Sequence, residues 1–244
     1  SMHADRIQQI SDYTDKLIER VVVVTGEAIK ALAPAKLAWG VGFSSLAVNR
    51  RQNKEPEVPK LRAAGLLKGP VDYEVPVLSI RSSDGKLVGV LFGYSCHATV
   101  MDFYKWSGDW PGFAMMDIEK RHPGATALFF AGCGADQNPL PRRKEEILPQ
   151  YGQLMGSAVE AVLAGHMHPI SGELASGYEE IPLPHDKLPT VEQVREDAKS
   201  TKSFMAARAK ALLKQVDAGH PLSPTYPYPI QLWKLGDGPE LVLL

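Results

Sequence analysis

Hydrophobic and polar positions follow helical spacing in some stretches of the chain and strand-like spacing in others. In residues 4–32, apolar positions recur at helical intervals and Pro34 closes the segment, which predicts a long amphipathic helix. Residues 36–48 are typical of a strand. The polar stretch 49–60, with its two prolines, indicates an exposed loop.

The middle of the chain predicts a hairpin, a short helix and a further strand. Two β-rich runs, 74–81 and 86–94, are joined by the turn sequence Ser-Ser-Asp-Gly. A helix is expected at 111–121, because Pro111 suits a first turn. Residues 125–131 are apolar throughout, which predicts a strand at the buried centre of a sheet covered on both faces.

The remaining elements complete an α/β pattern. Apolar residues from Tyr151 to Val162 share one face of a helix that Gly165 ends. Further elements are expected in this order: a strand at 172–183, a charged helix at 191–216 and a hairpin of residues 230–235 and 241–244. Long helices that alternate with apolar strands indicate an α/β fold, with a mixed β-sheet flanked by helices.

We expect residues 1–244 to form one α/β domain. The chain stops on an apolar run at 241–244, so we expect a piece of a larger catalytic domain, and the opening Ser1-Met2 is typical of tag cleavage. No run of about 18 apolar residues occurs, so no transmembrane segment is expected. Lys plus Arg (27) nearly balances Asp plus Glu (28), which argues against nucleic acid as a partner.

Polar groups gather in three segments that follow or flank predicted strands, namely 94–101, 107–114 and 132–139. Ligands bind at such strand ends in open α/β sheets. His97 is a candidate metal ligand, because a neutral imidazole is the commonest one in proteins. Asp109 and Asp136 could orient His97 or position a water molecule, and glycines in these segments keep backbone N–H groups available.

In order and separation, the three segments resemble motifs of the neutral ceramidase family (neutral/alkaline non-lysosomal ceramidases). That family carries His-Pro-Thr-Ser-Met, then Ser-Gly-Asp-x-x-Gly-Tyr-Ala, then an apolar strand and Gly-Asp-Val-Ser-Pro-Asn. An upstream Asn49-Arg50 pair is also similar, and the resemblance covers roughly residues 36–139. The matching positions are His97, Thr99, Met101, Ser107, Gly108, Asp109, Gly112, Ala114, Asp136 and Pro139.

The resemblance implies an incomplete ceramidase-like N-terminal catalytic domain: a zinc-dependent amidohydrolase that splits the N-acyl bond of ceramide or another lipid or small-molecule amide. It implies that His97 binds zinc and that Arg50 holds the substrate or the developing oxyanion. Asp109, Asp136 and Asn138 would surround the reacting bond. The family's other zinc ligands would lie outside the chain, and the resemblance implies a secreted or periplasmic protein.

Asn138 stands where the family has its active-site serine, so hydrolysis would rely on metal-activated water, with the Asn138 amide able to bind an oxyanion. Backbone N–H groups near Gly132 and Ala135 could add to that site. Substrate contacts are expected from three further residues: Asn49, Gly134 and Trp110.

Alternatives remain beside this interpretation. One is a non-catalytic ceramidase-like domain with a binding or assembly role. Another is a metal-free hydrolase that uses Cys133, although the strand, turn and helix that such a nucleophile needs are not predicted. Cys96 and Cys133 are expected as two buried thiols, with a disulfide as the alternative. His166 and His168 have a possible metal-binding spacing but are expected to interact with the end of a helix.

Overall fold

A computed structural model describes residues 2–244, so Ser1 of the expected Ser1-Met2 remnant lies outside the described residues. The chain divides into two compact units, Ser1–Ile170 and Ser171–Leu244, where we expected one domain. The division follows the strand pairing, because the strands after Ile170 pair only among themselves within the described chain. No helix in residues 2–244 is long and apolar enough to cross a membrane.

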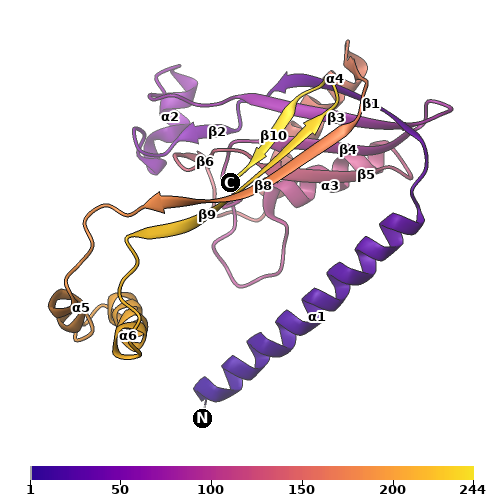
Figure 1. Cartoon of the computed structure of the whole chain (residues 1–244). Helices are drawn as coiled ribbons and strands as arrows, with labels where there is room; N and C mark the ends of the chain where they lie inside the picture. Colours follow the sequence, from indigo (N-terminus) through magenta and orange to yellow (C-terminus); the bar gives the residue numbers. More distant parts are fainter. Residues whose placement is uncertain (1) are drawn as a thin grey trace. The chain divides into compact units, whose positions relative to one another are not determined.

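The first unit contains a five-stranded mixed sheet of order β5-β4-β3-β1-β7 (Figure 1). Strands β4 and β5 are parallel, and the other neighbours are antiparallel. The elements are α1 (Met2–Lys30), β1 (Ala35–Phe43), β2 (Ala47–Asn49), η1 (Glu55–Glu57), α2 (Val58–Ala63), β3 (Glu74–Ser82), β4 (Leu87–Tyr94), α3 (Asp109–Arg121), β5 (Thr126–Ala131), β6 (Gln137–Pro139), α4 (Ile147–Ala164) and β7 (His168–Ile170). The predicted α/β class, with a mixed sheet flanked by helices, is confirmed.

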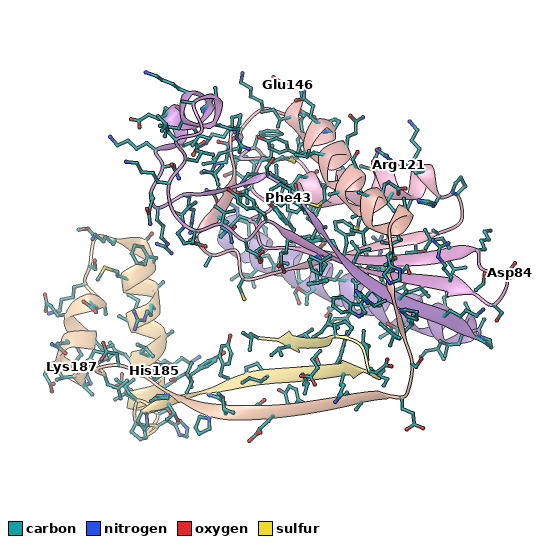
Figure 2. The ribbon with its side chains drawn as sticks, turned by 90° about the horizontal axis from the view of Figure 1, so that it is seen from above. Phe43, Asp84, Arg121, Glu146, His185 and Lys187 are labelled. Atoms are coloured by element: carbon teal, nitrogen blue, oxygen red, sulfur yellow. The ribbon has the colours of Figure 1, made fainter. Side chains whose placement is uncertain are left out.

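The core of this unit lies between the sheet and two helices. Helix α4, which begins after Glu146, packs beside α3, which ends at Arg121 (Figure 2). The fully buried side chains Phe92, Trp110 and Met155 come from the sheet and from both helices. Their removal from water is the main force that holds these layers together.

The strand β5 lies at an edge of the sheet, so the prediction that it forms a centre covered on both faces is wrong. Ala127 faces the core, but Leu128 on the opposite face is 53 % exposed. Val41 and Phe43 of β1 are exposed as well. An apolar run does not reveal which strands will pair beside it, and here β5 pairs with β4 alone.

Two predicted elements are each divided in two. The strand expected at 36–48 breaks into β1 and β2, because residues 44–46 turn toward the Tyr94 hydroxyl, which donates to the Ser44 carbonyl at 2.7 Å. The helix expected at 191–216 breaks into α5 (Val191–Asp197) and α6 (Ser203–Asp217). The loop expected at 49–60 also contains η1 and the start of α2.

The short strands β2 and β6 form a separate two-stranded sheet that matters for the site. Asn49 pairs with Gln137, and Val48 pairs with Asn138. The upstream Asn-Arg pair is thereby brought against the segment that follows β5. Segments almost 90 residues apart in sequence lie side by side at this point.

The second unit contains a three-stranded antiparallel sheet of order β10-β9-β8 and two helices. Its strands are β8 (Leu174–Pro184), β9 (Thr225–Leu235) and β10 (Glu240–Leu243), which confirms the predicted strand and final hairpin. Helix α5 begins at a capping box formed by Thr190 and Gln193. Among the described residues of this second unit, the buried hydrophobic side chains are Val194 and Ala209.

Helix α1 is present as predicted, but its apolar side chains are exposed. Ile10 is 67 % exposed and Leu17 is 46 % exposed. Tyr13 stacks on Trp106, with the ring centroids 5.7 Å apart.

Candidate functional site

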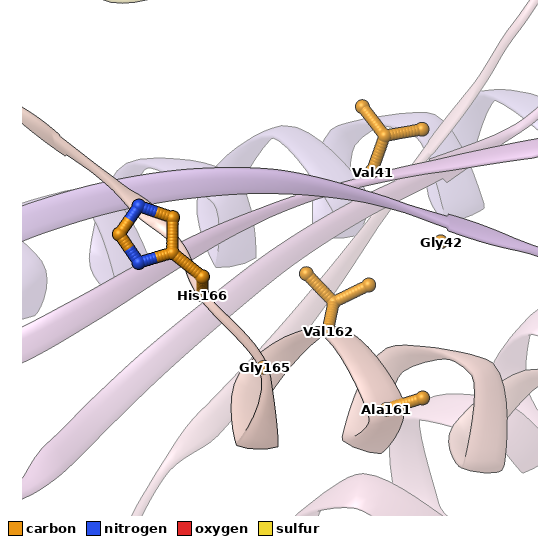
Figure 3. A pocket seen from close by; sticks show the side chains of 6 residues that line it. All are labelled: Val41, Gly42, Ala161, Val162, Gly165 and His166. Atoms are coloured by element: carbon orange, nitrogen blue, oxygen red, sulfur yellow. The ribbon is translucent and has the colours of Figure 1, made fainter.

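A shallow cavity of about 220 Å³ lies between β1 and α4, away from every predicted site residue (Figure 3). Val41, Gly42, Val162 and His166 are among its lining residues. Ring centroids of His166 and His168 are 5.4 Å apart, and within residues 2–244 no group of three or more His, Cys, Asp or Glu side chains could hold a metal ion. The predicted site residues lie instead at the strand ends around His97.

His97 follows β4, and its ring has a fixed orientation. Its backbone N–H donates to the Gln137 carbonyl at 3.0 Å, and ring nitrogen Nδ1 lies 3.0 Å from the same oxygen. A carbonyl oxygen only accepts, so Nδ1 carries the proton. In the neutral ring Nε2 then holds a lone pair, and Nε2 has no hydrogen-bond partner among the described residues. In metal-binding histidines, one ring nitrogen usually donates to a carbonyl oxygen or a carboxylate, and the other ring nitrogen binds the metal.

Trp110 fixes the other side of the same loop. Its indole Nε1–H donates to the His97 carbonyl at 3.0 Å. The ring is fully buried and meets the rings of Tyr94 and Phe129 edge to face. Trp110 thus supports the backbone of His97 from the protein interior, and the substrate contact expected of it stays a prediction.

Gln137 joins the His97 loop to a second, part-buried network that runs through the exposed Asp72. Its side-chain oxygen accepts from the Asp72 N–H at 3.0 Å, and the Asp72 carboxylate accepts from the Ser95 hydroxyl at 2.7 Å. Ser95 and Gln137 are both buried. The sequence analysis missed this network. Gln137 lies inside the polar segment 132–139, but no feature of the sequence indicates a role for Asp72.

Asp109 has a structural role in the fold. Its carboxylate accepts from the backbone N–H groups of Val100 (3.2 Å), Met101 (2.9 Å) and Trp110 (2.7 Å). The residue is 6 % exposed and has φ 51°, a left-handed conformation that aspartate tolerates better than most residues. The carboxylate thus holds the chain that follows His97, and within residues 2–244 it forms no hydrogen bond with the His97 ring.

Asn49 and Arg50 both form hydrogen bonds to the segment that contains Asp136. The Asn49 amide donates to Asp136 Oδ2 at 3.0 Å and to the Pro70 carbonyl, and its oxygen accepts from two following backbone N–H groups. Arg50 Nε donates to the Ala135 carbonyl at 3.1 Å. Asn49 is buried and fully bonded within the protein, so it positions Asp136. The two Nη groups of Arg50 have no hydrogen-bond partner among residues 2–244.

Asn138 is buried in β6, at 4 % exposure, and its side-chain oxygen has no hydrogen-bond partner in the described protein. A buried amide oxygen without a donor costs free energy on the order of 1–3 kcal/mol. Unsatisfied groups of this kind are uncommon and often coincide with binding sites. Asn138 is therefore the predicted site residue with the clearest unused hydrogen-bonding capacity.

Gly134 is packed against backbone. A Cβ placed there would lie 2.6 Å from the Cys96 nitrogen and 2.7 Å from the Ser95 carbonyl carbon. The close approach of two strand ends explains this glycine. No ligand is needed to account for it, whereas we had expected it to contact a substrate.

The two cysteines are free thiols in different surroundings. Cys96 is buried, and its burial raises the pKa of the thiol far above its ordinary value, with the nearby Asp109 adding to the effect. Cys133 is exposed, so the expectation of two buried thiols is wrong for this residue. No histidine ring is bonded to Cys133 in the described chain, which leaves the predicted nucleophile without a base.

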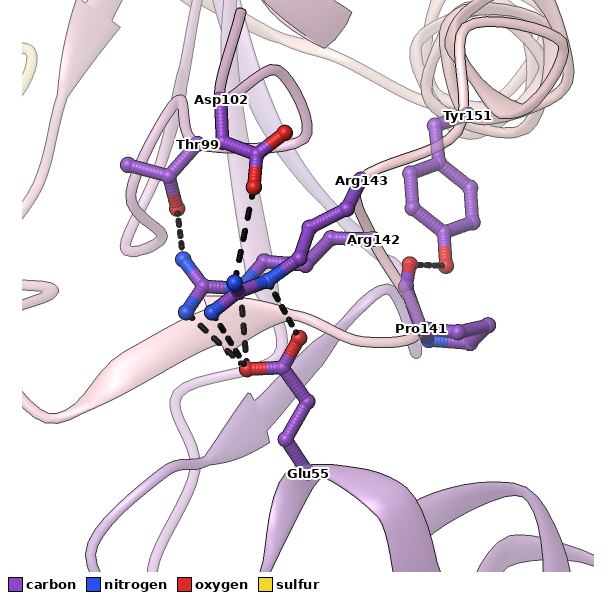
Figure 4. Close-up of polar contacts among 7 residues, drawn as sticks. All are labelled: Glu55, Thr99, Asp102, Pro141, Arg142, Arg143 and Tyr151. Carbon is purple, nitrogen blue, oxygen red and sulfur yellow. Dashed lines mark hydrogen bonds and ion pairs between the residues drawn. The ribbon is translucent and has the colours of Figure 1, made fainter.

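A charged cluster fastens the loop after His97 to two other segments (Figure 4). Arg142 donates to Glu55 at 3.0 Å and to the Thr99 hydroxyl at 3.2 Å, and Arg143 donates to Glu55 at 3.1 Å and to Asp102 at 3.4 Å. The hydrogen bond from Arg142 is the main cause of a lowered Glu55 pKa. The spacing of residues gave no sign of this cluster before the fold was known.

Tyr151 of α4 anchors the same segment. Its hydroxyl donates to the Pro141 carbonyl at 2.6 Å (Figure 4). Burial raises the pKa of Tyr151 to about 12, so the hydroxyl stays protonated and available as a donor at neutral pH.

Solved structures with this fold include ceramidases. A crystal structure of neutral ceramidase from Pseudomonas aeruginosa matches with a TM-score of 0.63 and 18 % identity, over 91 % of this chain and 42 % of that chain. A ceramidase complexed with C2 matches with a TM-score of 0.56 and 17 % identity, over 83 % of this chain and 40 % of that chain. The chain has a ceramidase-like fold. It spans about two fifths of the length of these structures.

No family model matches the sequence, and no curated protein matches it. The likeness therefore concerns the fold. At these identities it leaves the roles of individual residues to be argued from their own geometry.

Proposed function

We propose that this chain is a hydrolase domain of the neutral-ceramidase type that cleaves an N-acyl amide such as ceramide. The observation that carries the proposal is His97, whose Nδ1 is held by the Gln137 carbonyl while Nε2 keeps an unpaired lone pair at a strand end. The ceramidase-like fold supports the substrate class.

His97 fits the role of one zinc ligand, because its protonated nitrogen is already held by a carbonyl. The described residues do not supply a complete set of ligands. A bound zinc ion would polarise the amide carbonyl and lower the pKa of a bound water toward about 7. The rest of the proposal concerns side chains of this chain only.

Asn138 would hold the oxygen of the scissile carbonyl. Its buried amide has no partner on the oxygen side, and the side-chain N–H₂ group has no partner among residues 2–244. An amide N–H₂ can donate to an oxygen that gains negative charge, but an amide cannot be deprotonated to attack carbon. No covalent acyl intermediate is therefore expected at this position.

Arg50 and Asp136 would act beside Asn138. The Nη groups of Arg50 can bind the substrate or its developing charge, while Nε keeps the side chain in place on Ala135. Asp136 uses one carboxylate oxygen to accept from Asn49 and retains the other for a water molecule. Trp110 and Asp109 would position His97 from the protein interior.

The test titrates the full 244-residue chain with a large excess of zinc, because His97 alone supplies only part of a ligand set and should bind the ion weakly. We expect zinc to bind in a His97-dependent manner, so His97→Ala should abolish it, while His220→Ala in the second unit should leave it unchanged. Release of fatty acid from a ceramide should disappear with His97→Ala and fall on the order of 10²-fold with Asn138→Ala, which removes one oxyanion donor. Zinc binding that does not depend on His97 would contradict the proposal.

The competing proposal is a non-catalytic ceramidase-like domain that binds lipid amides. The use of Asn49 and Asp109 in internal hydrogen bonds favours it. It predicts saturable ceramide binding without release of fatty acid at any zinc concentration. The same titration therefore separates the two proposals.

A further inference from the structure

Two aromatic side chains next to the candidate site are the most exposed large hydrophobic residues of the described chain. They are Tyr104, which is fully exposed, and Trp106, which is 89 % exposed. Both lie in the loop 101–107 that connects the His97 segment to α3. Tyr13 of α1 stacks on one face of Trp106 and is itself half exposed.

The base of this loop is held by many polar contacts (Figure 4). Asp109 accepts from the Val100 and Met101 N–H groups. The Arg143 N–H donates to the Val100 carbonyl at 2.7 Å, and its guanidinium donates to Asp102. Further along, Lys105 pairs with Glu145 at 2.6 Å. The loop therefore projects Tyr104 and Trp106 into solvent from a fixed base.

The charges around the loop are balanced. Lys105 pairs with Glu145, and the two arginines pair with Glu55 and Asp102, so no excess of positive charge faces outward. A surface that binds anionic lipid or nucleic acid would have such an excess. The exposed side chains are the aromatic rings of Tyr104 and Trp106. Each ring carries one polar O–H or N–H group, as is typical of residues at a lipid–water interface.

We propose that the 101–107 loop docks on the surface of a zwitterionic lipid bilayer through Tyr104 and Trp106, beside the site that would act on a lipid amide. The choice of this partner rests on the proposed function. The loop brings the site to the lipid surface, and the rings insert at headgroup level while the base stays bonded to the protein.

The test is co-sedimentation of the full chain with phosphatidylcholine vesicles that contain no ceramide. The double variant Tyr104→Ser/Trp106→Ser should lower the vesicle partition coefficient on the order of tenfold or more, because the loop loses both of its exposed aromatic rings. Tyr104→Phe/Trp106→Phe should retain binding. A matched control, Phe204→Ser/Tyr226→Ser, removes exposed aromatic residues of the second unit and should have no effect. Added salt should change wild-type binding little.

Failure of the loop proposal and failure of the proposed function can be told apart. Vesicle binding is measured without turnover, so wild-type binding that depends on Tyr104 and Trp106 supports the loop proposal even if no amide is cleaved. Equal vesicle binding by the serine double variant and the wild type would overturn it. So would a wild-type dimer that becomes monomeric in the double variant, since a second copy would then cover these rings.

Discussion

The loops around His97 and the unit 171–244 are built in opposite ways. His97 lies in an irregular loop, yet the residues that hold this loop are buried and bonded to backbone groups. They are Gln137 at the start of β6 and Asp109 and Trp110 at the start of α3. The second unit has two 11-residue strands, but Val194 and Ala209 are its buried hydrophobic residues among those described. Regular hydrogen bonding and tight packing are therefore separate properties here, and the cost of a substitution should follow burial.

The largest expected difference between the two regions concerns a pair of tryptophans. Trp110→Ala should lower the free energy of unfolding by about 3–5 kcal/mol, because a fully buried indole leaves a cavity and an unpaired His97 carbonyl. Trp233→Ala, at a strand position that is 37 % exposed, should cost about 1 kcal/mol. Urea denaturation followed by far-UV circular dichroism measures both.

A Trp110→Phe variant separates the hydrogen bond from the packing. It keeps an aromatic ring but removes the N–H that donates to His97, so a loss of about 1 kcal/mol is expected together with weaker zinc binding. Equal costs for the alanine variants at 110 and 233 would show that burial is not the difference between the regions.

Two glycines give the next contrast. Gly134→Ala should destabilise the protein by about 1–3 kcal/mol, because its Cβ would meet the backbone of Ser95 and Cys96, which cannot move aside as a side chain could. Gly177→Ala in β8 adds a Cβ with nothing within 4 Å and should be neutral or slightly stabilising. Thermal unfolding of the two variants beside the wild type is the measurement. A neutral result at 134 would contradict the close packing of Gly134 against Ser95 and Cys96.

The fold could be predicted from the sequence where the signal is local. The hairpin of β3 and β4 was evident from its turn, and α4 was evident from its apolar face and from Gly165. The edge position of β5 could not be predicted, because it depends on which strands lie beside it. The break between α5 and α6 could not be predicted either, because residues 198–202 contain no glycine or proline.

The same distinction between local signals and features that depend on the fold applies to the candidate site. His97 is predicted from its residue type at a strand end, whereas Asn138 is predicted only from its position in the ceramidase-like motif. The roles of both residues stay predictions. The group that orients His97 is the carbonyl of Gln137, 40 residues away. Every residue has a carbonyl, so no sequence pattern could have identified it. The contact between Glu55 and Arg142 likewise depends on the pairing of β2 with β6, which the sequence did not reveal.

The smallest expected effect concerns Glu55 and depends on pH. Arg142 and Arg143 hold the Glu55 pKa below its ordinary value, so the folded state favours the ionised carboxylate. This contribution is fully present above the ordinary glutamate pKa of about 4.3 and disappears as pH falls through the lower folded value. Glu55→Gln should therefore cost about 1 kcal/mol at pH 7, and its stability should converge with that of the wild type on acidification. Glu196→Gln, which breaks a pair whose side chains are 72 % and 76 % exposed, should change little at either pH. If the cost of Glu55→Gln stays constant down to acidic pH, the cluster stabilises the His97 loop through hydrogen bonds that do not require an ionised carboxylate, and the charge of Glu55 contributes nothing measurable.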